Sequence, residues 1–115
     1  MRYSHLMSAD GVRQAVSAAI AASTSAHADL ERFKLACLPD PLPVLVHVDE
    51  FNARNLGTTP GDHLAWLVTN GGGPQAVFFD EDSGRFGACW GPDRATGDHV
   101  DIGFRSADPV EMYLV

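Results

Sequence analysis

The chain is poor in the residues and segments that mark several large protein classes. It has only two cysteines, Cys37 and Cys89, which lie far apart and form no C-x-x-C step. A disulfide framework or a zinc ribbon needs more cysteines in closer groups, so neither is expected. The two thiols are predicted to be free in the core, and the expected location of the protein is cytoplasmic.

Long hydrophobic runs are also missing. No stretch approaches the roughly 20 consecutive apolar residues of a membrane-spanning helix. The N-terminal residues MRYSHLMSADG lack the apolar run of a signal peptide. A membrane is therefore not expected as a partner.

Basic residues are scarce in the second part of the chain. Residues 1–39 hold four basic and three acidic residues, a net charge of +1, whereas residues 40–115 hold four basic and twelve acidic residues, a net charge of −8. Such a surface repels the phosphates of nucleic acids, so the sequence argues against nucleic-acid binding. It attracts a basic protein instead, although a negative charge can also serve simply to keep a small protein soluble.

The 115 residues are enough for one domain over 1–115. Residues 8–38 are predicted to be helical, because Val12, Val16 and Ile20 recur at four-residue spacing. Serine and threonine in AASTSA offer the backbone competing hydrogen bonds, so either one bent helix or two helices are expected. The prolines of LPDPLP end this helical segment.

Residues 44–115 change to a β-rich pattern. Residues 52–62 are predicted to form a loop, and strands are predicted at 44–51, 63–70, 75–80, 85–91, 99–104 and 110–115. Together these features predict an α+β fold, in which the N-terminal helix or helix pair packs on a mostly antiparallel sheet of about five or six strands. One face of that sheet is expected to stay partly open.

The run FFDEDSGRFGACWG contains the most concentrated group of acids. Asp80, Glu81 and Asp82 precede Ser83-Gly84 between two aromatic-rich strand segments, which is typical of a hairpin turn. A calcium loop of the EF-hand type needs further carboxylate ligands that this run does not supply. The sequence therefore predicts a hairpin tip with three solvent-facing acids.

The tripeptide His-Val-Asp occurs twice, and it suggests a metal site. On a strand, residues i and i+2 share a face, so His47 with Asp49 and His99 with Asp101 can each present an imidazole and a carboxylate together. If the two strands were neighbours, these four groups could converge on a metal ion. The alternative is that each pair lies independently on the solvent-exposed face of a sheet.

Other catalytic signatures are absent from the sequence. TNGGGPQ lacks the Lys-Ser or Lys-Thr that a phosphate-binding loop requires. Ser83 lacks a G-x-S-x-G context, and Cys89 has no helix N-terminus beside it to activate a thiol. No catalytic residue and no cofactor are therefore expected.

A helical segment, then PVLVHVD, then HLAWLVTNGGGPQAVFFDEDSGRFGACWGP resembles the small α+β immunity proteins of bacterial polymorphic toxin systems. The resemblance rests on a glycine-to-aspartate strand step, Gly73 to Asp80, followed by a turn and a second strand from Phe86 to Gly91. LAWLVTNGG is also similar to a strand step of the SUKH group of immunity proteins. The resemblance implies a non-enzymatic cytoplasmic antidote that occludes the active site of a cognate toxin, and it carries over no individual contact residue.

Three functions follow as hypotheses. The first is a protein-binding module, specifically an immunity protein, in which acids pair with a basic toxin cleft and an exposed aromatic anchors the centre of the interface. The predicted contact residues are Asp80, Glu81, Asp82, Asp93, Asp98, Asp101, Phe79 and Trp90. The second is a small metal-dependent enzyme that uses the paired His and Asp residues. The third is a homo-oligomeric or small-ligand-binding domain, with the open sheet face as a dimer surface.

Overall fold

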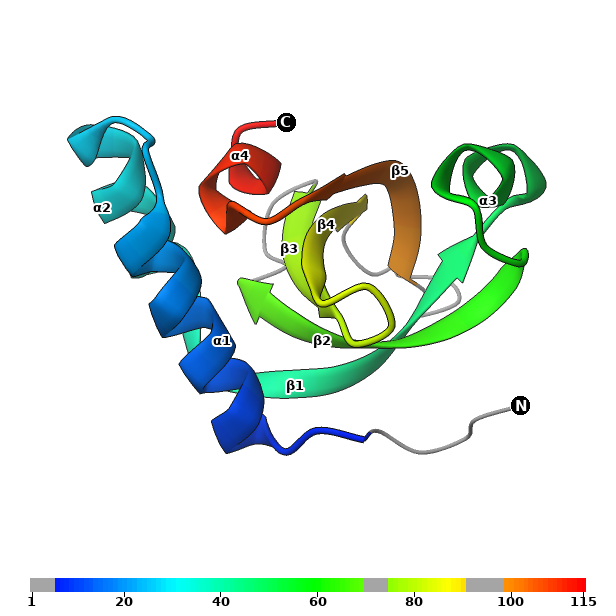
Figure 1. Ribbon diagram of the computed structural model, residues 1–115, viewed down its shortest axis with the longest axis horizontal. Helices are drawn as coiled ribbons and strands as arrows, with labels where there is room; N and C mark the ends of the chain where they lie inside the picture. Colours follow the sequence, from blue (N-terminus) through cyan, green and yellow to red (C-terminus); the bar gives the residue numbers. More distant parts are fainter. Residues whose placement is uncertain (1–5, 70–74, 91–98) are drawn as a thin grey trace.

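The computed structural model describes residues 6–69, 75–90 and 99–115. Its elements follow one another as α1, α2, β1, α3, β2, β3, β4, β5 and α4 (Figure 1). The fold is α+β, as the sequence predicts, and the described residues form five strands. These strands lie in the order β1-β2-β3-β4-β5 and close into a barrel.

The N-terminal segment forms two helices. Helix α1 spans Ala9–Ala22, and the Ser8 hydroxyl oxygen accepts a hydrogen bond from the Gly11 amide at its start. Helix α2 spans His27–Ala36. The break between the helices lies at the serine-rich run, which confirms the second of the two predicted forms.

Strand β1, Cys37–Val48, begins earlier than predicted. The prolines do end the preceding helix, since α2 stops at Ala36, but the strand runs through Pro39, Pro41 and Pro43. The fixed φ of proline is compatible with extended backbone, so the residues that stop a helix can still belong to a strand where they need not donate a hydrogen bond.

Two short helices replace predicted loop and strand structure. Helix α3, Glu50–Leu56, covers the end of the first predicted strand and the first half of the predicted loop. It runs from an Asp49 cap to Gly57, whose φ of 71° ends the helix in the left-handed region. Helix α4, Pro109–Tyr113, lies where a last strand is predicted. Asp108 caps α4 and Pro109 opens it, and this start signal outweighs the β-favouring residues that follow.

The remaining strands are β2 (Gly61–Thr69), β3 (Gln75–Asp80), β4 (Arg85–Trp90) and β5 (His99–Ser106). Each neighbouring pair along this order is antiparallel, from β1 with β2 to β4 with β5, whereas β1 and β5 pair in parallel and close the barrel. Strands β3 and β4 form the predicted hairpin, in which Gly84 adopts a φ of 69°.

The two sides of the sheet form separate cores. The outer side packs against helices α1, α2 and α4, which lie along one flank of the barrel (Figure 1). Its buried residues are Val12, Val16, Phe33, Trp66, Val68, Val77, Phe79, Phe86, Ala88, Val110 and Met112. The inner side holds Val46, Ala65, Leu67, Ala76, Phe78 and Cys89. The expectation of a partly open second face is therefore wrong, because closure turns that face into the interior of the barrel.

Candidate functional site at the barrel mouth

A buried group of charges lies on the inner side of the barrel. The Arg105 side chain on β5 donates to Asp101 over 2.7 Å and to Asp80 over 3.1 Å. The exposed fractions of these side chains are 10% for Arg105, 0% for Asp101 and 15% for Asp80. The guanidinium also lies 4.8 Å from the centre of the Phe78 ring. We refer to Arg105, Asp101 and Asp80 as the charge triad.

Two local features position the triad: a glycine that leaves space for it, and a helix that is hydrogen-bonded to its strand. A Cβ on Gly87 would lie 2.4 Å from the Phe78 ring and 2.7 Å from the Arg105 guanidinium, so only glycine leaves the space that both groups occupy. The second feature is helix α3, because the side-chain amide of Asn52 donates a hydrogen bond to the backbone carbonyl oxygen of Asp101 over 3.0 Å. This bond ties α3 to β5 at the mouth of the barrel.

The triad keeps its cation charged. Burial disfavours the charge of Arg105, but the hydrogen bonds and charges of Asp101 and Asp80 outweigh burial, and the pKa of Arg105 is raised above its ordinary value. A guanidinium in this state does not exchange a proton at any physiological pH. The Arg105 guanidinium therefore acts as a fixed cation that holds the two carboxylates.

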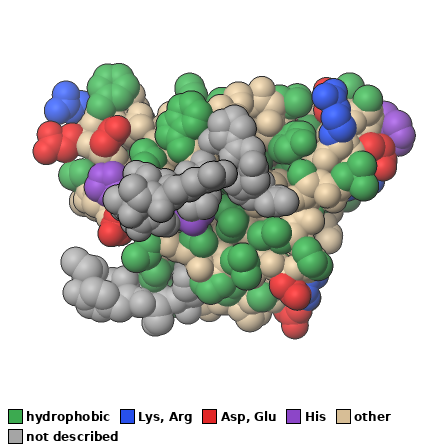
Figure 2. Space-filling model, turned by 180° about the vertical axis from the view of Figure 1, so that it is seen from behind, with side chains coloured by type: hydrophobic (Ala, Val, Ile, Leu, Met, Phe, Trp, Pro, Cys, Tyr) green, Lys and Arg blue, Asp and Glu red, His purple; other side chains and the backbone are tan. Residues whose placement is uncertain are grey.

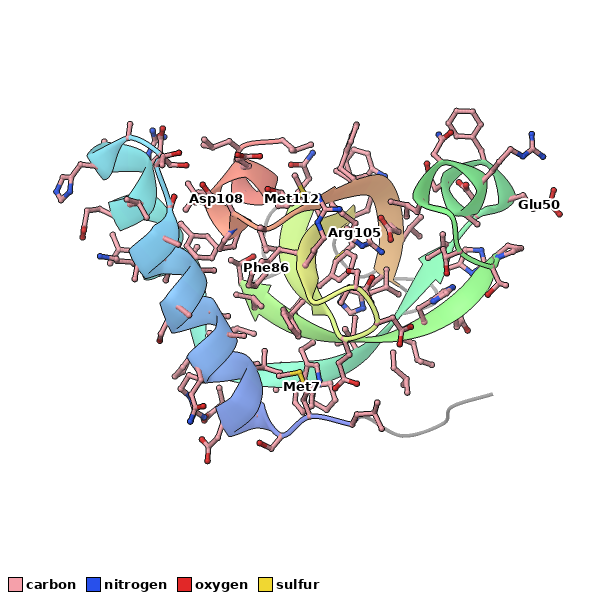
Figure 3. All side chains as sticks on the ribbon, viewed as in Figure 1. Met7, Glu50, Phe86, Arg105, Asp108 and Met112 are labelled. Atoms are coloured by element: carbon pink, nitrogen blue, oxygen red, sulfur yellow. The ribbon has the colours of Figure 1, made fainter. Side chains whose placement is uncertain are left out.

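Above the triad the surface is hollowed. A hollow of about 410 Å³ is lined by α3, the loop after it, the β3–β4 turn, His63 and Arg105. A neighbouring hollow of about 390 Å³ shares His63 and Asp82 with it and continues along the loop before β2. Figure 3 shows Arg105 between α3 and the β3–β4 turn, in the part of the molecule that the first hollow occupies. The His63 ring is held in place, since its Nε2 lies 2.6 Å from the Thr59 carbonyl oxygen.

The three acids of the hairpin do not all face solvent, which corrects the prediction. Asp80 turns inward to Arg105. Glu81 accepts hydrogen bonds from the Leu6 and Met7 amides, at 3.0 and 3.1 Å, and from the Trp66 indole at 2.6 Å. Asp82 is the exposed member of the three. The carboxylates of Asp80 and Glu81 therefore serve mainly to hold the turn and the N-terminal segment.

The other predicted contact residues are likewise divided into buried and exposed side chains. Asp101 is buried in the triad and Phe79 is 4% exposed in the outer core, so neither can touch a partner, and the prediction is wrong for both. Phe79 instead packs edge-on against Phe86, with ring centres 5.3 Å apart. Trp90 is 49% exposed. Asp93 and Asp98 lie outside the residues that the structure describes.

The four residues of the predicted metal site lie on or beside neighbouring strands, but their side chains do not converge on one point. The two strands are neighbours, since β1 and β5 pair Val46 with His99. However, the Asp49 carboxylate caps α3 by accepting a hydrogen bond from the backbone amide of Asn52 at 2.7 Å, and the Asp101 carboxylate is bound by Arg105. The His47 ring lies 3.1 Å from Asp62. Within the described ranges, no group of three or more His, Cys, Asp or Glu side chains is placed to hold a metal ion.

The two cysteines are free, and they are not nucleophiles in this fold. Burial, with the nearby charge of Asp101, raises the pKa of Cys89 to about 12. Burial raises the pKa of the partly buried Cys37 to about 11. Both thiols stay protonated at neutral pH, so neither supplies the thiolate that covalent catalysis requires. The prediction of free thiols is confirmed for both residues, and the predicted core position is confirmed for Cys89, whereas Cys37 is only partly buried against the core.

Arg105, the residue at the centre of the site, is not among the residues predicted from the sequence. Arg105 follows Asp101 at a spacing of four, so both side chains share one face of a strand, and this spacing was available as a signal. It was missed because an acid and an arginine on a strand also fit a solvent-exposed face. Their burial follows from the closure of the sheet, which no local pattern of residues expresses.

Comparison with known proteins adds no family to this description. Neither a scan against family models nor searches of curated proteins and of solved structures gives a match. Among the described helices, none is long and apolar enough to cross a membrane. The resemblance to immunity proteins stays a prediction from the sequence.

Proposed function

We propose that the chain is a non-enzymatic protein-binding module, and specifically an immunity protein that occludes the active site of a basic toxin. The observation that carries this proposal is a set of exposed aromatic side chains on an acidic domain. Phe51, Trp90 and Phe104 are 70%, 49% and 55% exposed, although the chain has 115 residues and a net charge of −7. Figure 2 shows hydrophobic side chains spread across the back of the molecule.

Exposed aromatic rings are typical of protein interfaces. They bury a large area at a small entropic cost, and in interfaces they often lie at the centre of a ring of polar contacts. The buried polar groups of the site support the same function, because the charge triad is engaged in holding the barrel together. A molecule of this kind inhibits by covering the active site of its partner, and it needs no chemistry of its own.

The proposal predicts that a toxin domain is encoded beside this gene, and such a domain is the partner to use in the test. That domain and the chain are co-expressed in a sensitive bacterial host, and the mixture of the purified proteins is run on a sizing column. We expect growth to be restored and the two proteins to elute as one complex. Continued growth arrest, with the two proteins eluting separately at low and moderate salt, would contradict the proposal.

A homodimer is the competing use of the exposed apolar surface. Leu42 and Leu45 of β1 are 49% and 52% exposed, and Trp90 on β4 is similarly open. Light scattering of the chain alone across micromolar concentrations distinguishes the two functions. A monomer is expected for the immunity protein, and a stable dimer that does not bind the toxin domain favours self-association.

A further inference from the structure

The guanidinium of Arg105 has one N–H group that no described residue accepts. Its Nε donates to Asp80 over 3.1 Å, and its Nη2 donates to Asp101 over 2.7 Å. Its Nη1 donates twice, to Asp101 over 3.2 Å and to the Phe104 carbonyl oxygen over 2.9 Å. An arginine side chain has five N–H groups, so the second N–H of Nη2 is left over. Because this side chain is only 10% exposed, an unsatisfied donor here is unusual and indicates an acceptor that the protein itself does not supply.

A second arginine lines the same hollow of about 410 Å³ as Arg105, and it lacks an acidic partner. Within the described ranges, Arg85 forms no ion pair, and its Nη2 donates to the Arg105 carbonyl oxygen over 3.2 Å. Asp80 lies opposite Arg85 in the β3–β4 register, but both of its carboxylate oxygens already accept hydrogen bonds, Oδ1 from a backbone amide and Oδ2 from Arg105. The remaining N–H groups of Arg85 are therefore available at the hollow.

Unlike the whole chain, the lining of this hollow has no net charge. Asp80 and Asp82 are matched by Arg85 and Arg105, whereas the chain has a net charge of −7. An anion therefore meets less repulsion here than the charge of the whole chain would suggest. The lining also has no excess of cations that would hold two negative charges at once.

Neutral groups complete the lining. Asn55 and Thr58 add a side-chain amide and a hydroxyl, and in the part of the molecule that the structure describes neither group has a hydrogen-bond partner. Leu56 adds apolar surface. A volume of about 410 Å³ lies in the range of sites for small organic ligands, and an inorganic anion would fill only a small part of it.

We infer that this hollow binds a small organic molecule with one carboxylate group. The carboxylate accepts hydrogen bonds from the leftover N–H of Arg105 and from Arg85, and the rest of the molecule lies against Leu56. A planar guanidinium matches the two oxygens of a carboxylate, and hydrogen bonds between oppositely charged groups are stronger than those between neutral groups. The site is separate from the exposed aromatic residues of the proposed function, so the two assignments stand or fall independently.

The test titrates the full ¹⁵N-labelled chain with benzoate at constant ionic strength, and with benzamide as a neutral probe of the same shape. Benzoate should shift the backbone amides of Gly57, Thr58 and Ser83 and the Nε–H signals of both arginines. We expect a dissociation constant on the order of millimolar, as is usual for a ligand of this size. Equal shifts with benzamide, or shifts that concentrate on α1 and α2, would overturn the inference. So would the absence of a saturable shift with benzoate, because water would then be sufficient as the acceptor.

Two substitutions of equal charge sharpen the test. R85M removes a guanidinium that lines the hollow, and R54M removes one from α3 that does not line it and that likewise forms no ion pair with a described residue. R85M should weaken benzoate binding about fivefold, and R54M should leave it within about twofold. Equal weakening by both variants would mean that the net charge of the chain governs binding, and the inference would fail.

The buried donor is tested in the parent protein, because substitution of Arg105 would also disturb the triad. Its Nε–H signal should move with benzoate and stay in place with benzamide. An Arg105 signal that is unchanged when the site is saturated would show that the leftover donor takes no part, which overturns the inference.

A carboxylate on a polypeptide is the competing occupant. A blocked peptide with a single glutamate between glycines carries the same group, but its backbone must stay outside the hollow. We expect it to bind more weakly than benzoate. Tighter binding of the peptide would assign the hollow to a protein partner and overturn its assignment to a free small molecule.

Discussion

The outer and inner sides of the sheet are filled by different kinds of side chain. The outer side brings together large apolar residues such as Phe33, Trp66 and Phe86 beneath three helices. The inner side has smaller residues, such as Ala65 and Ala76, and it ends in a buried arginine with two carboxylates. Side chains of the same strands thus enter two environments: the outer one is covered by helices, and the inner one is closed at one end by the charge triad.

This difference teaches how a small barrel can be closed at one end. The interior is too narrow for many aromatic rings, and Phe78 already takes the space that Gly87 leaves. Near the mouth, water is close, so a purely apolar plug would be partly wet. Arg105 stacks its planar guanidinium on the Phe78 ring and directs its N–H groups to carboxylates. It therefore fills the space at the mouth, and its charged group remains stable where water is near.

The strongest way to break the inner side is to remove its cation. R105A leaves the Asp101 carboxylate buried without its ion partner, and we expect the free energy of unfolding to fall by about 3–5 kcal/mol. Urea unfolding followed by circular dichroism measures the loss. The control is R105M/D101N, which removes both charges and should cost less than R105A alone. An R105A variant as stable as the parent would show that the triad contributes little to closure.

High pH compares one thiol from each side. Cys89 belongs to the inner core, and Cys37 packs against the outer one, and their pKa values are raised to about 12 and about 11 from an ordinary value of 9.0. Above pH 9 the unfolded chain loses these protons while the folded chain keeps them, so stability is full below pH 9 and falls as the pH rises toward 11. Each thiol contributes a slope of at most about 1.4 kcal/mol per pH unit.

Urea unfolding at a series of alkaline pH values measures these slopes. C89A and C37A should each flatten the pH dependence, and the variants are compared by slope because the substitutions also change the packing. Above about pH 11 the slope that remains should belong to Cys89 alone. A parent protein whose stability is independent of pH through this range would contradict the burial of both thiols.

Overpacking tests the narrowness of the interior. G87A places a methyl group against the Phe78 ring and Arg105, and we expect a loss of about 1–3 kcal/mol. G11A is the matched control on α1, where the nearest atom lies 3.4 Å from the new Cβ and alanine favours the helix. The prediction fails if both substitutions leave the melting temperature unchanged or raise it.

The outer side also has a polar link, and its removal should have the smallest effect. Asp108 caps α4 and accepts hydrogen bonds from Ser23 and Ser25, at 2.7 and 3.0 Å, which join α4 to the turn between α1 and α2 (Figure 3). D108A should cost about 1–2 kcal/mol in thermal or urea unfolding. D108N keeps an oxygen for the cap and should lose less. Equal losses from the two variants would mean that the carboxylate charge, rather than the cap, is what matters.

The sequence predicted the parts of the fold that local patterns determine. The spacing of Val12 and Val16 predicted a helix that buries both residues, and the turn at Gly84 was predicted from its place between two aromatic strands. Helix α4 was missed because valine and tyrosine favour strands, although Asp108 and Pro109 carried the opposite signal.

The candidate site was harder to predict because it depends on contacts between distant segments. Whether Asp80 faces solvent or Arg105 depends on the position of β5, because Arg105 lies 25 residues further along the chain. The same closure separates Asp49 from Asp101, since one caps α3 and the other enters the barrel. Alternation along a strand identifies residues that share a face, but it does not say which face becomes the interior.

The prolines of β1 have a consequence for how the protein behaves in a crowded cell. The register of β1 against β2 is irregular between Cys37 and Leu42, and Pro39, Pro41 and Pro43 lie in or next to this stretch. Proline has no N–H group, so this part of β1 has few hydrogens to offer to an incoming strand. A bare strand edge can pair with strands of other molecules and form fibres, and the prolines of β1 hinder such pairing.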